Sequence, residues 1–283
     1  MICDLHTHSI FSDGTATPEE LIALAESKGL TAIALTDHNC ADGLPRFLKA
    51  AEGSSVTAVP GIEFSTGWQD GELHILALFV RPEHYDQVRA IASEPDRLKR
   101  QSNIDLAAAL QKAGYEVDFY ELEAATPNGR VNRAQFAAAL VKGGYVKTNQ
   151  EAFEHLLNEK GPYYQPPQRL DALEVIRFIR SIGAVAVLAH PFFKHSPAQI
   201  EEFLASAIPA GLDGMETVYS TYDDDTTALA FHMASQYGLY QSGGSDYHGD
   251  RKPDIDLGTG RGNLVIPAEF YRRLAALAEQ RQG

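Results

Sequence analysis

Histidine and carboxylate side chains that could bind metal ions recur along this chain. His6 and His8 stand two residues apart in Asp4-Leu5-His6-Thr7-His8, and Asp13 follows in a turn-like segment. Alternate residues of a strand share one face, so residues 4, 6 and 8 are expected on the same face. Two imidazoles placed in this way at a strand end can bind a single metal ion.

Further candidate ligands follow at intervals through the rest of the sequence. They are His38, Glu63, His74, His190, Asp246 and His248. A lone histidine is more often a structural or surface residue than a ligand, and on that view His84, His155 and His232 need no role. Six histidines and three carboxylates with similar placement are harder to attribute to chance, and they predict a polynuclear metal site.

Short apolar runs precede most of these residues and predict the strands that position them. The runs cover residues 2–5, 31–36, 56–60, 73–80, 184–189, 213–218 and 239–242. They are nearly continuous, as is typical of buried parallel strands. Polar residues at the C-terminal ends of such strands form the functional face of a parallel barrel. His74 is an exception because it stands at the start of its run, which indicates either a shifted boundary or a strand in the opposite direction.

Helix signals alternate with these runs. Thr17-Pro18-Glu19-Glu20 predicts a capped helix start, and Gly29 stands where its end is expected. Residues 171–181 and 225–237 resemble further helices. The alternation predicts an α/β fold, and seven strands indicate barrel-like closure. Residues 97–169 lack the strand rhythm and predict a helical insertion into a barrel domain formed by residues 1–96 and 170–283.

The composition limits the possible partners. The 283 residues include 38 acidic and 24 basic side chains, and this balance opposes non-specific binding to duplex DNA or anionic membranes. The apolar runs are far shorter than the roughly 18 residues that span a bilayer. Two cysteines cannot form a disulfide framework, and no signal peptide is visible, so we expect a cytoplasmic protein. No obligate protein partner is evident.

The order of these motifs resembles the PHP family (polymerase and histidinol phosphatase) of the amidohydrolase-like barrels. The matching motifs are His6-X-His8, Asp13, Asp37-His38, Gly61-X-Glu63, His74, His190-Pro191 and Asp246-X-His248. The resemblance implies a distorted (β/α)7 barrel of the PHP type that holds three divalent metal ions.

The same resemblance implies how the ligands are shared among the three ions. One ion would be held by His6, His8, Glu63 and Asp246. Glu63 would bridge to a second ion, which His74 and His190 also hold. Asp13, His38 and His248 would hold the third. Mn²⁺ is the first expectation, with Fe²⁺ or Zn²⁺ as alternatives, because histidine–carboxylate sites accept all three.

Within the family, the helical insertion resembles members that act on nucleotides. The resemblance implies a phosphatase that hydrolyses the 3′-phosphate of nucleoside 3′,5′-bisphosphates through a metal-bridging hydroxide. Three divalent ions outweigh three carboxylates, so the site would favour a phosphate dianion. Three alternatives stay open: a 5′-to-3′ exoribonuclease on short 5′-phosphorylated RNA, a histidinol-phosphatase-like phosphomonoesterase, and an inert PHP binding module.

Substrate-binding residues are expected mainly in the insertion, which has ten basic and eight acidic residues and is the least acidic part of the chain. The guanidinium group of arginine can donate two parallel hydrogen bonds to the oxygens of one phosphate group. The candidates are Arg97, Arg100, Asn103, Arg130, Asn132, Arg133 and Gln135, with Lys194 at the barrel rim. For Arg97 and Arg100, ordinary salt bridges on a solvated helix face are an equal alternative. His195, close after His190-Pro191, is a candidate general acid.

Overall fold

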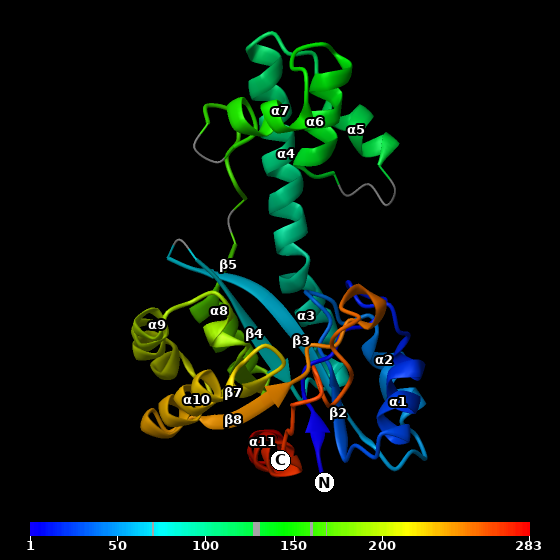
Figure 1. Cartoon of the computed structure of the whole chain (residues 1–283), viewed down its shortest axis with the longest axis vertical. Coiled ribbons are helices and arrows are strands. Elements are labelled where there is room, and N and C mark those ends of the chain that lie inside the picture. The colour runs from blue at the N-terminus through cyan, green and yellow to red at the C-terminus, as the bar shows by residue number, and fades with distance from the viewer. Residues whose placement is uncertain (70, 127–130, 159–160, 168) are drawn as a thin grey trace. The chain divides into compact units, whose positions relative to one another are not determined.

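The computed structural model describes residues 1–283 except 70, 127–130, 159–160 and 168 (Figure 1). It divides into two compact units. The first unit comprises Met1–Ala92 and Leu170–Gly283, and the second comprises Ser93–Arg169. The expected start of the insertion, residue 97, lies inside the long helix α4 (Glu94–Lys112) of the second unit.

A nearly closed barrel forms the centre of the first unit. Seven strands follow one another in the order β1-β2-β3-β4-β6-β7-β8, and β5 pairs with β3 beside this path. Their bounds are β1 (Cys3–Asp4), β2 (Ala32–Leu35), β3 (Thr57–Trp68), β4 (Gly71–Leu78), β5 (Leu170–Asp171), β6 (Val185–Leu188), β7 (Gly214–Tyr219) and β8 (Tyr240–Gly244). The N–H of Leu5 donates to the carbonyl of Gly243 at 3.1 Å, which joins the first strand to the last. The predicted barrel is confirmed.

Strand β4 runs in the opposite direction to its two neighbours, which explains why His74 stands at the start of its strand. It is antiparallel to both β3 and β6, whereas the other pairs along the path are parallel. The start of β4 therefore lies at the barrel end where the parallel strands finish, and His74 pairs with Ser65 across the β3–β4 hairpin. The sequence placed the end of the third strand near Pro60, but β3 continues to Trp68. Pro60 stands where the pairing of β3 changes from β2 to β4.

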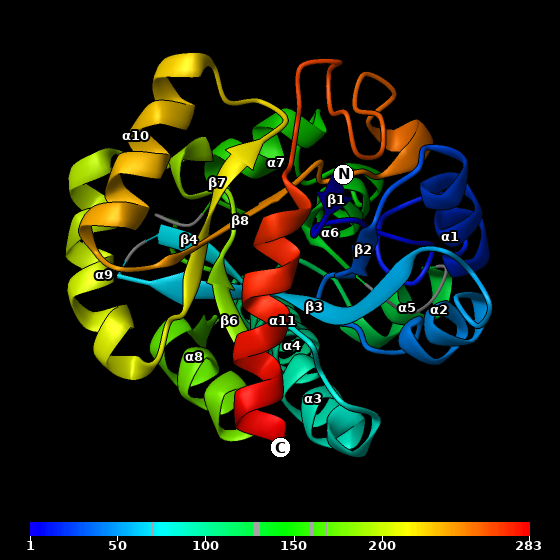
Figure 2. The ribbon, with the colours of Figure 1, turned by 90° about the horizontal axis from the view of Figure 1, so that it is seen from below.

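Alternate residues of the strands face two different cores. Ile33, Ile75 and Ala186 belong to an outer core between the barrel and its helices. Their neighbours, such as Leu76 and Val187, fill the barrel interior. Figure 2 shows α11 lying across the strands, and its apolar face joins the interior core. The barrel is therefore filled by side chains, and its chemistry must lie at the strand ends.

The first barrel helix, α1 (Pro18–Ser27), begins at the predicted cap. In α1, the Thr17 hydroxyl accepts a hydrogen bond from the N–H of Glu20, whose carboxylate in turn accepts from the N–H of Thr17. The helices of this unit are α1 (Pro18–Ser27), α2 (Leu44–Ala50), α3 (Tyr85–Ala92), α8 (Ala172–Ser181), α9 (Pro197–Ala210), α10 (Asp224–Gln236) and α11 (Ala268–Gln282). Short 3-10 turns are η1 (Pro82–His84), η3 (Pro191–Phe193) and η4 (Gly249–Arg251).

The secondary-structure elements that the structure describes in the second unit are all helices, and they enclose a separate core. Its helices are α4 (Glu94–Lys112), α5 (Phe119–Ala125), α6 (Arg133–Lys142) and α7 (Asn149–His155). Leu106, Phe136 and Leu157 are buried at its centre. Among the residues that the structure describes, no helix of either unit is long and apolar enough to cross a membrane.

Candidate metal centre

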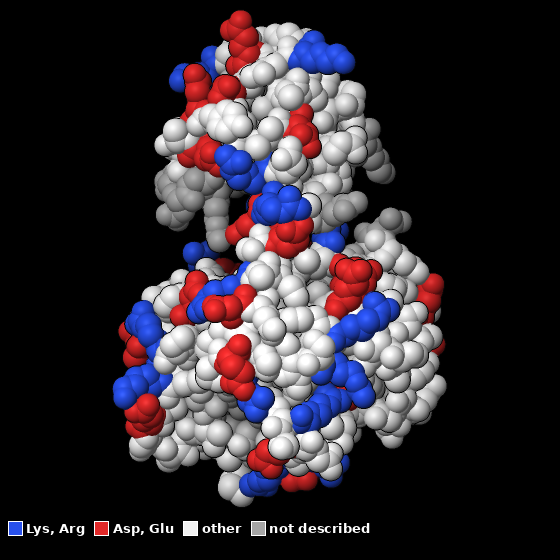
Figure 3. All heavy atoms as spheres, turned by 180° about the vertical axis from the view of Figure 1, so that it is seen from behind, with Lys and Arg blue, Asp and Glu red and all other residues white. Residues whose placement is uncertain are grey.

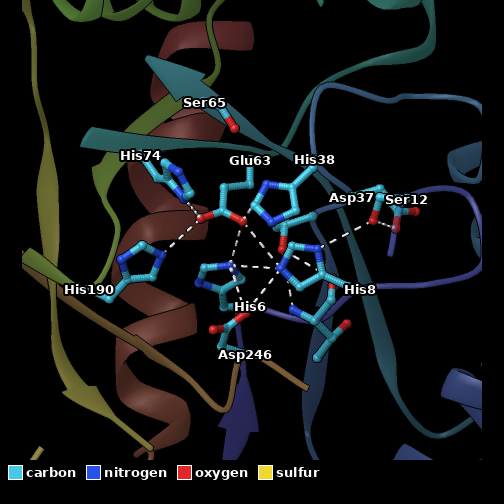
Figure 4. A network of polar contacts seen from close by, with 12 residues as sticks. His6, His8, Ser12, Asp37, His38, Glu63, Ser65, His74, His190 and Asp246 are labelled. Carbon is cyan, nitrogen blue, oxygen red and sulfur yellow. Dashed lines mark hydrogen bonds and ion pairs between the residues drawn. The ribbon is translucent and has the colours of Figure 1, made fainter. Parts of the chain in front are cut away.

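The nine predicted ligands gather at one end of the barrel because of where their strands end. His6 and His8 follow β1, His38 follows β2, and His190 follows β6. Glu63 lies within β3 and His74 near the start of β4. Figure 4 shows imidazoles from several of these elements pointing toward the Glu63 carboxylate.

Glu63 is the buried centre of this cluster, and its two oxygens face different groups of imidazoles. Oε1 lies 2.7 Å from His74 Nδ1 and 2.9 Å from His190 Nε2. Oε2 lies 3.1–3.2 Å from nitrogens of three other rings, those of His6, His8 and His38. A carboxylate with this arrangement can contribute one oxygen to each of two adjacent metal ions.

Two further carboxylates complete the cluster. Asp246 Oδ1 lies 3.2 Å from His8 Nε2 and 3.4 Å from His248 Nδ1. Asp13 Oδ1 lies 3.2 Å from His248 Nε2 and 4.0 Å from His38 Nε2. All nine predicted side chains are therefore brought together, and His8 and His38 stand between the Glu63 side and the Asp13 side.

Ring nitrogens of the cluster lie close together, and two of its buried polar atoms lack a hydrogen-bond partner among the described residues. Nε2 of His6 and Nε2 of His8 are 3.1 Å apart. Glu63 Oε2 and His38 Nδ1 are buried, and neither atom has a hydrogen-bond partner among the described residues. Unpaired buried polar atoms are costly, and a cation between them would remove that cost. The donors thus fit metal ions.

Among the described residues, four overlapping groups have ligand atoms close enough for one ion each. They are His8, Asp13, His38 and His248; His6, Glu63 and His190; His6, His8 and Asp246; and His38, Glu63 and His74. Imidazole nitrogen and carboxylate oxygen suit Mn²⁺, Fe²⁺ or Zn²⁺. The sharing of these ligands among three ions stays a prediction.

Electrostatics keep the central carboxylate ionised. Burial opposes its charge, but His6, His38 and His74 outweigh burial and hold the pKa of Glu63 well below its usual range. Burial opposes a positive charge on His8 and would lower its pKa, but the neighbouring Asp246 and Glu63 carboxylates outweigh burial and raise the pKa to about 9. A histidine binds a metal ion through an unprotonated nitrogen, so metal binding here is expected to release protons.

The backbone at two ligands adopts an uncommon conformation. His190 has φ 29° and Asp246 has φ 57°, in the left-handed region that non-glycine residues seldom occupy. Both stand just after the ends of their strands, β6 and β8. Strained backbone of this kind concentrates at functional sites, where the surroundings enforce it.

Glu216, on β7, forms hydrogen bonds with two of the predicted ligands. Its Oε1 lies 3.0 Å from His6 Nδ1, and its Oε2 accepts the backbone N–H of His190 at 2.6 Å. Glu216 was not among the residues predicted from the sequence, although an acid within an apolar strand such as 213–218 is itself a signal. The carboxylate holds His6 with Nε2 directed at the cluster, as the partners of metal-bound histidines usually do.

Asp246 also has outer partners that were missed. Its Oδ2 accepts hydrogen bonds from the Tyr219 hydroxyl and from Lys252 Nζ, both at 2.7 Å. Its Oδ1 is thereby left facing the histidines. No pattern in the sequence distinguished Lys252 from other surface lysines.

Two other acids of the motifs brace loops instead of joining the ligands. Asp37 accepts hydrogen bonds from Ser9 and from the Ser12 hydroxyl. Asp4 accepts from the N–H groups of Ser245 and Gly258. Asp4, which was expected on the same face as His6 and His8, is in none of the candidate ligand groups found among the described residues.

A pocket in the first unit opens onto the cluster. Its lining residues are His38, Glu63, Glu72, Leu73, His74, Ala189, His190, Phe193, Lys194, His195, Tyr219, Asp246 and Lys252. The predicted residues Lys194 and His195 are therefore at the site. Nε2 of His195 lies 2.8 Å from the Glu72 carbonyl oxygen. A carbonyl can only accept, so this nitrogen carries a proton.

The predicted substrate residues of the insertion have partners within that unit. Arg97 pairs with Glu94, and Arg100 pairs with Glu123. Such exposed pairs are the alternative that the sequence left open, and Figure 3 shows Lys or Arg beside Asp or Glu at many points of one face. Asn103 is buried and donates to the Val131 carbonyl.

The remaining predicted residues of the insertion surround the start of α6. Asn132 and Gln135 cap this helix reciprocally. Arg133 donates to the carbonyl of Leu157, and its guanidinium lies 4.4 Å from the ring centroid of Tyr164. Arg130 lies outside the described residues. Local packing thus accounts for Asn132, Arg133 and Gln135, and their substrate-binding role stays a prediction.

Comparisons with known proteins agree with this geometry. The PHP domain family model matches residues 4–163. The 3′,5′-nucleoside bisphosphate phosphatase of Chromobacterium violaceum is 32% identical over 277 residues, 96% of each chain. The 5′-3′ exoribonuclease of Escherichia coli is 29% identical over 271 residues, 95% of this chain and 91% of that protein.

A solved structure supports the same conclusion. A Bifidobacterium adolescentis protein, provisionally described as a metal-dependent phosphoesterase, matches 97% of this chain and 96% of its own, with a TM-score of 0.68 and 26% identity. The match extends over the barrel and the helical unit. With the ligand cluster at the strand ends, these similarities establish that the chain belongs to the PHP domain family, as a metal-dependent phosphoesterase.

Proposed function

We propose that this phosphoesterase removes the 3′-phosphate from nucleoside 3′,5′-bisphosphates, such as adenosine 3′,5′-bisphosphate, and releases a 5′-mononucleotide and phosphate. The observation that carries the proposal is the pocket, which Lys194 and Lys252 line together with residues of the ligand cluster. A substrate with two phosphates needs cationic groups besides those that bind the scissile one. The similarity to the bisphosphate phosphatase over nearly the whole chain supports this choice.

The ligand cluster would hold the metal ions that the reaction requires. When bound, divalent ions supply Lewis acidity and a water of lowered pKa as the nucleophile. We expect three ions, with Mn²⁺ first, distributed as the family resemblance implies. Glu63 would contribute one oxygen to each of two ions, since its Oε1 and Oε2 face different imidazoles.

Lys252 and Lys194 would bind phosphate oxygens. Lys252 donates one of its three N–H groups to Asp246 Oδ2, which fixes the ammonium at the pocket wall with donors to spare. Lys194 Nζ lies 4.0 Å from Glu72 Oε2, and its side chain is 59% exposed. Each ammonium would lower the energy of the charge that gathers on the phosphates.

His195 is the candidate for protonating the leaving 3′-oxygen. Its Nε2–H is donated to the Glu72 carbonyl, so a proton for the substrate must come from Nδ1 of the doubly protonated ring. A His195→Ala variant with unchanged turnover would remove this residue from the role.

A second candidate function is exonucleolytic cleavage of short 5′-phosphorylated RNA. The Escherichia coli relative carries the name of this activity and aligns with most of the chain. Both reactions break a bond at the 3′-oxygen of a nucleotide that bears a 5′-phosphate. One pocket could therefore accept either substrate.

Product analysis with added Mn²⁺ tests the proposal. Adenosine 3′,5′-bisphosphate, a 5′-phosphorylated RNA trinucleotide and histidinol phosphate are compared at equal concentration, with Glu63→Gln as the inactive control. The proposal predicts the highest kcat/KM for the bisphosphate. Faster cleavage of the trinucleotide would favour the exonuclease, and faster hydrolysis of histidinol phosphate would contradict both. Less than one metal ion per chain would instead favour an inert binding module.

A further inference from the structure

Phe193 exposes an aromatic ring at the edge of the metal-site pocket. It is 52% exposed and ends the 3-10 turn η3, which follows the ligand His190 directly. Among the exposed large apolar residues that the structure describes, Phe193 is the one that lines this pocket. Scattered apolar side chains on a surface need no explanation, but an aromatic ring that lines a pocket beside histidine, carboxylate and lysine side chains can contact a bound substrate.

Neighbouring side chains hold the ring in a defined orientation. Its centroid lies 6.0 Å from that of His190 and 6.2 Å from that of Tyr219, with interplanar angles of 73° and 66°. Both contacts are edge-to-face, the arrangement that aromatic pairs prefer. The ring is thus oriented by two residues of the site while about half of Phe193 remains open to solvent.

A cation accompanies this ring. Lys194 Nζ lies 5.7 Å from the Phe193 ring centroid, and both side chains line the pocket. An aromatic surface beside an ammonium matches a molecule with a flat π-system and an anionic group. Nucleotides have both features. Every base has a π-face, whichever polar groups it carries at its edge.

We propose that Phe193 is a specificity-determining residue on which the nucleobase of the substrate stacks. The inference rests on the proposed function, in which a nucleotide occupies this pocket. Phe193 then selects nucleotides over phosphate esters that lack an aromatic group, and it does so with little discrimination among the bases. It takes no part in bond cleavage.

Competition between two ligands that differ only by the base tests this role. Adenosine 5′-monophosphate and ribose 5-phosphate are each measured as inhibitors of p-nitrophenyl phosphate hydrolysis, and the ratio of their inhibition constants reports the contribution of the base. The account predicts that wild type prefers the nucleotide. Phe193→Ala is expected to reduce this preference by about 5-fold to 150-fold, the range for loss of one base–aromatic stack.

Two variants separate stacking from structural damage. Phe193→Trp keeps an aromatic face and should retain the preference. Tyr240→Ala is the control, because Tyr240 is also an exposed aromatic residue (38%) but lies at the end of β8 that is opposite to Asp246. This variant should keep the wild-type ratio of inhibition constants. Loss of the preference in Phe193→Trp as severe as in Phe193→Ala would overturn the stacking role.

The outcome is independent of whether the bisphosphate is hydrolysed. If wild type hydrolyses p-nitrophenyl phosphate but not adenosine 3′,5′-bisphosphate, the proposed function fails while the inhibition ratio still decides the role of Phe193. If Phe193→Ala keeps the full preference for the nucleotide, or if wild type shows none, the stacking proposal is wrong even where the bisphosphate is a good substrate.

Discussion

Glu216 lies directly behind His6, with its Oε1 3.0 Å from Nδ1 of that ring. Both side chains are fully buried. The contact fixes the orientation of the ring and directs Nε2 at the cluster. Because the other Glu216 oxygen accepts the N–H of His190, one carboxylate positions two predicted ligands.

Loss of the Glu216 carboxylate should therefore weaken metal binding. We expect Glu216→Gln to bind Mn²⁺ about 10-fold to 100-fold more weakly, the usual effect of removing the outer partner of a metal-bound histidine. Metal content after equilibration in buffered Mn²⁺ measures this effect. Thr217→Val changes the adjacent buried polar residue, which bonds Ser242, and should keep wild-type affinity. Equal metal content in Glu216→Gln and wild type would show that Glu216 does not position the ligands.

Gly244 is required because β8 passes close to His6. A Cβ added at Gly244 would lie 2.1 Å from His6 Cβ and 2.9 Å from its Cα, so Gly244→Ala must displace this ligand. We expect loss of metal binding together with a lower Tm. Gly238→Ala is the matched control, because its φ of +67° makes alanine strained but no atom lies within 4 Å of the added Cβ. It should be about 1–2 kcal/mol less stable and still bind metal. Normal metal binding by Gly244→Ala would contradict the geometry.

Lys252 is predicted to bind phosphate. Replacing it by methionine removes a charged donor from the pocket wall, which we expect to raise KM for the bisphosphate by about 10-fold to 100-fold. Steady-state kinetics at saturating Mn²⁺ measure the change. Lys28→Met is the control, since Lys28 pairs with Asp256 and does not line the pocket. Similar KM values for wild type and Lys252→Met would exclude Lys252 from substrate binding.

The positions of most ligands could be predicted from the sequence, because apolar runs followed by His, Asp or Glu mark the C-terminal ends of parallel strands. His74 could not be placed, since a single run does not reveal its direction, and only the pairing of β4 with β3 and β6 does. Pro60-Gly61 resembled a strand end although β3 continues through it. Lys252 had no local signal, because its role depends on a contact made by tertiary folding.

Different thiol reactivity of the two cysteines is expected from their surroundings. Cys3 is fully buried in the barrel, and burial, aided by the negative charge of Asp4, raises the pKa of its thiol to about 12. A raised pKa keeps the thiol protonated and unreactive at pH 8, whereas Cys40 is partly exposed. A thiol reagent at pH 8 should therefore label Cys40 and spare Cys3 in the folded protein, and label both in denaturant. Rapid labelling of Cys3 in a folded Cys40→Ser variant would show that the barrel is more open than described.

The identity of the mononucleotide formed from adenosine 3′,5′-bisphosphate tests the central claim most directly. Chromatography separates the 5′- from the 3′-monophosphate, and parallel reactions contain either added Mn²⁺ or a chelator. The account predicts adenosine 5′-monophosphate and one equivalent of phosphate with Mn²⁺, and no reaction with the chelator. Adenosine 3′-monophosphate as the product, or no phosphate release from protein that has bound its metal ions, would contradict it.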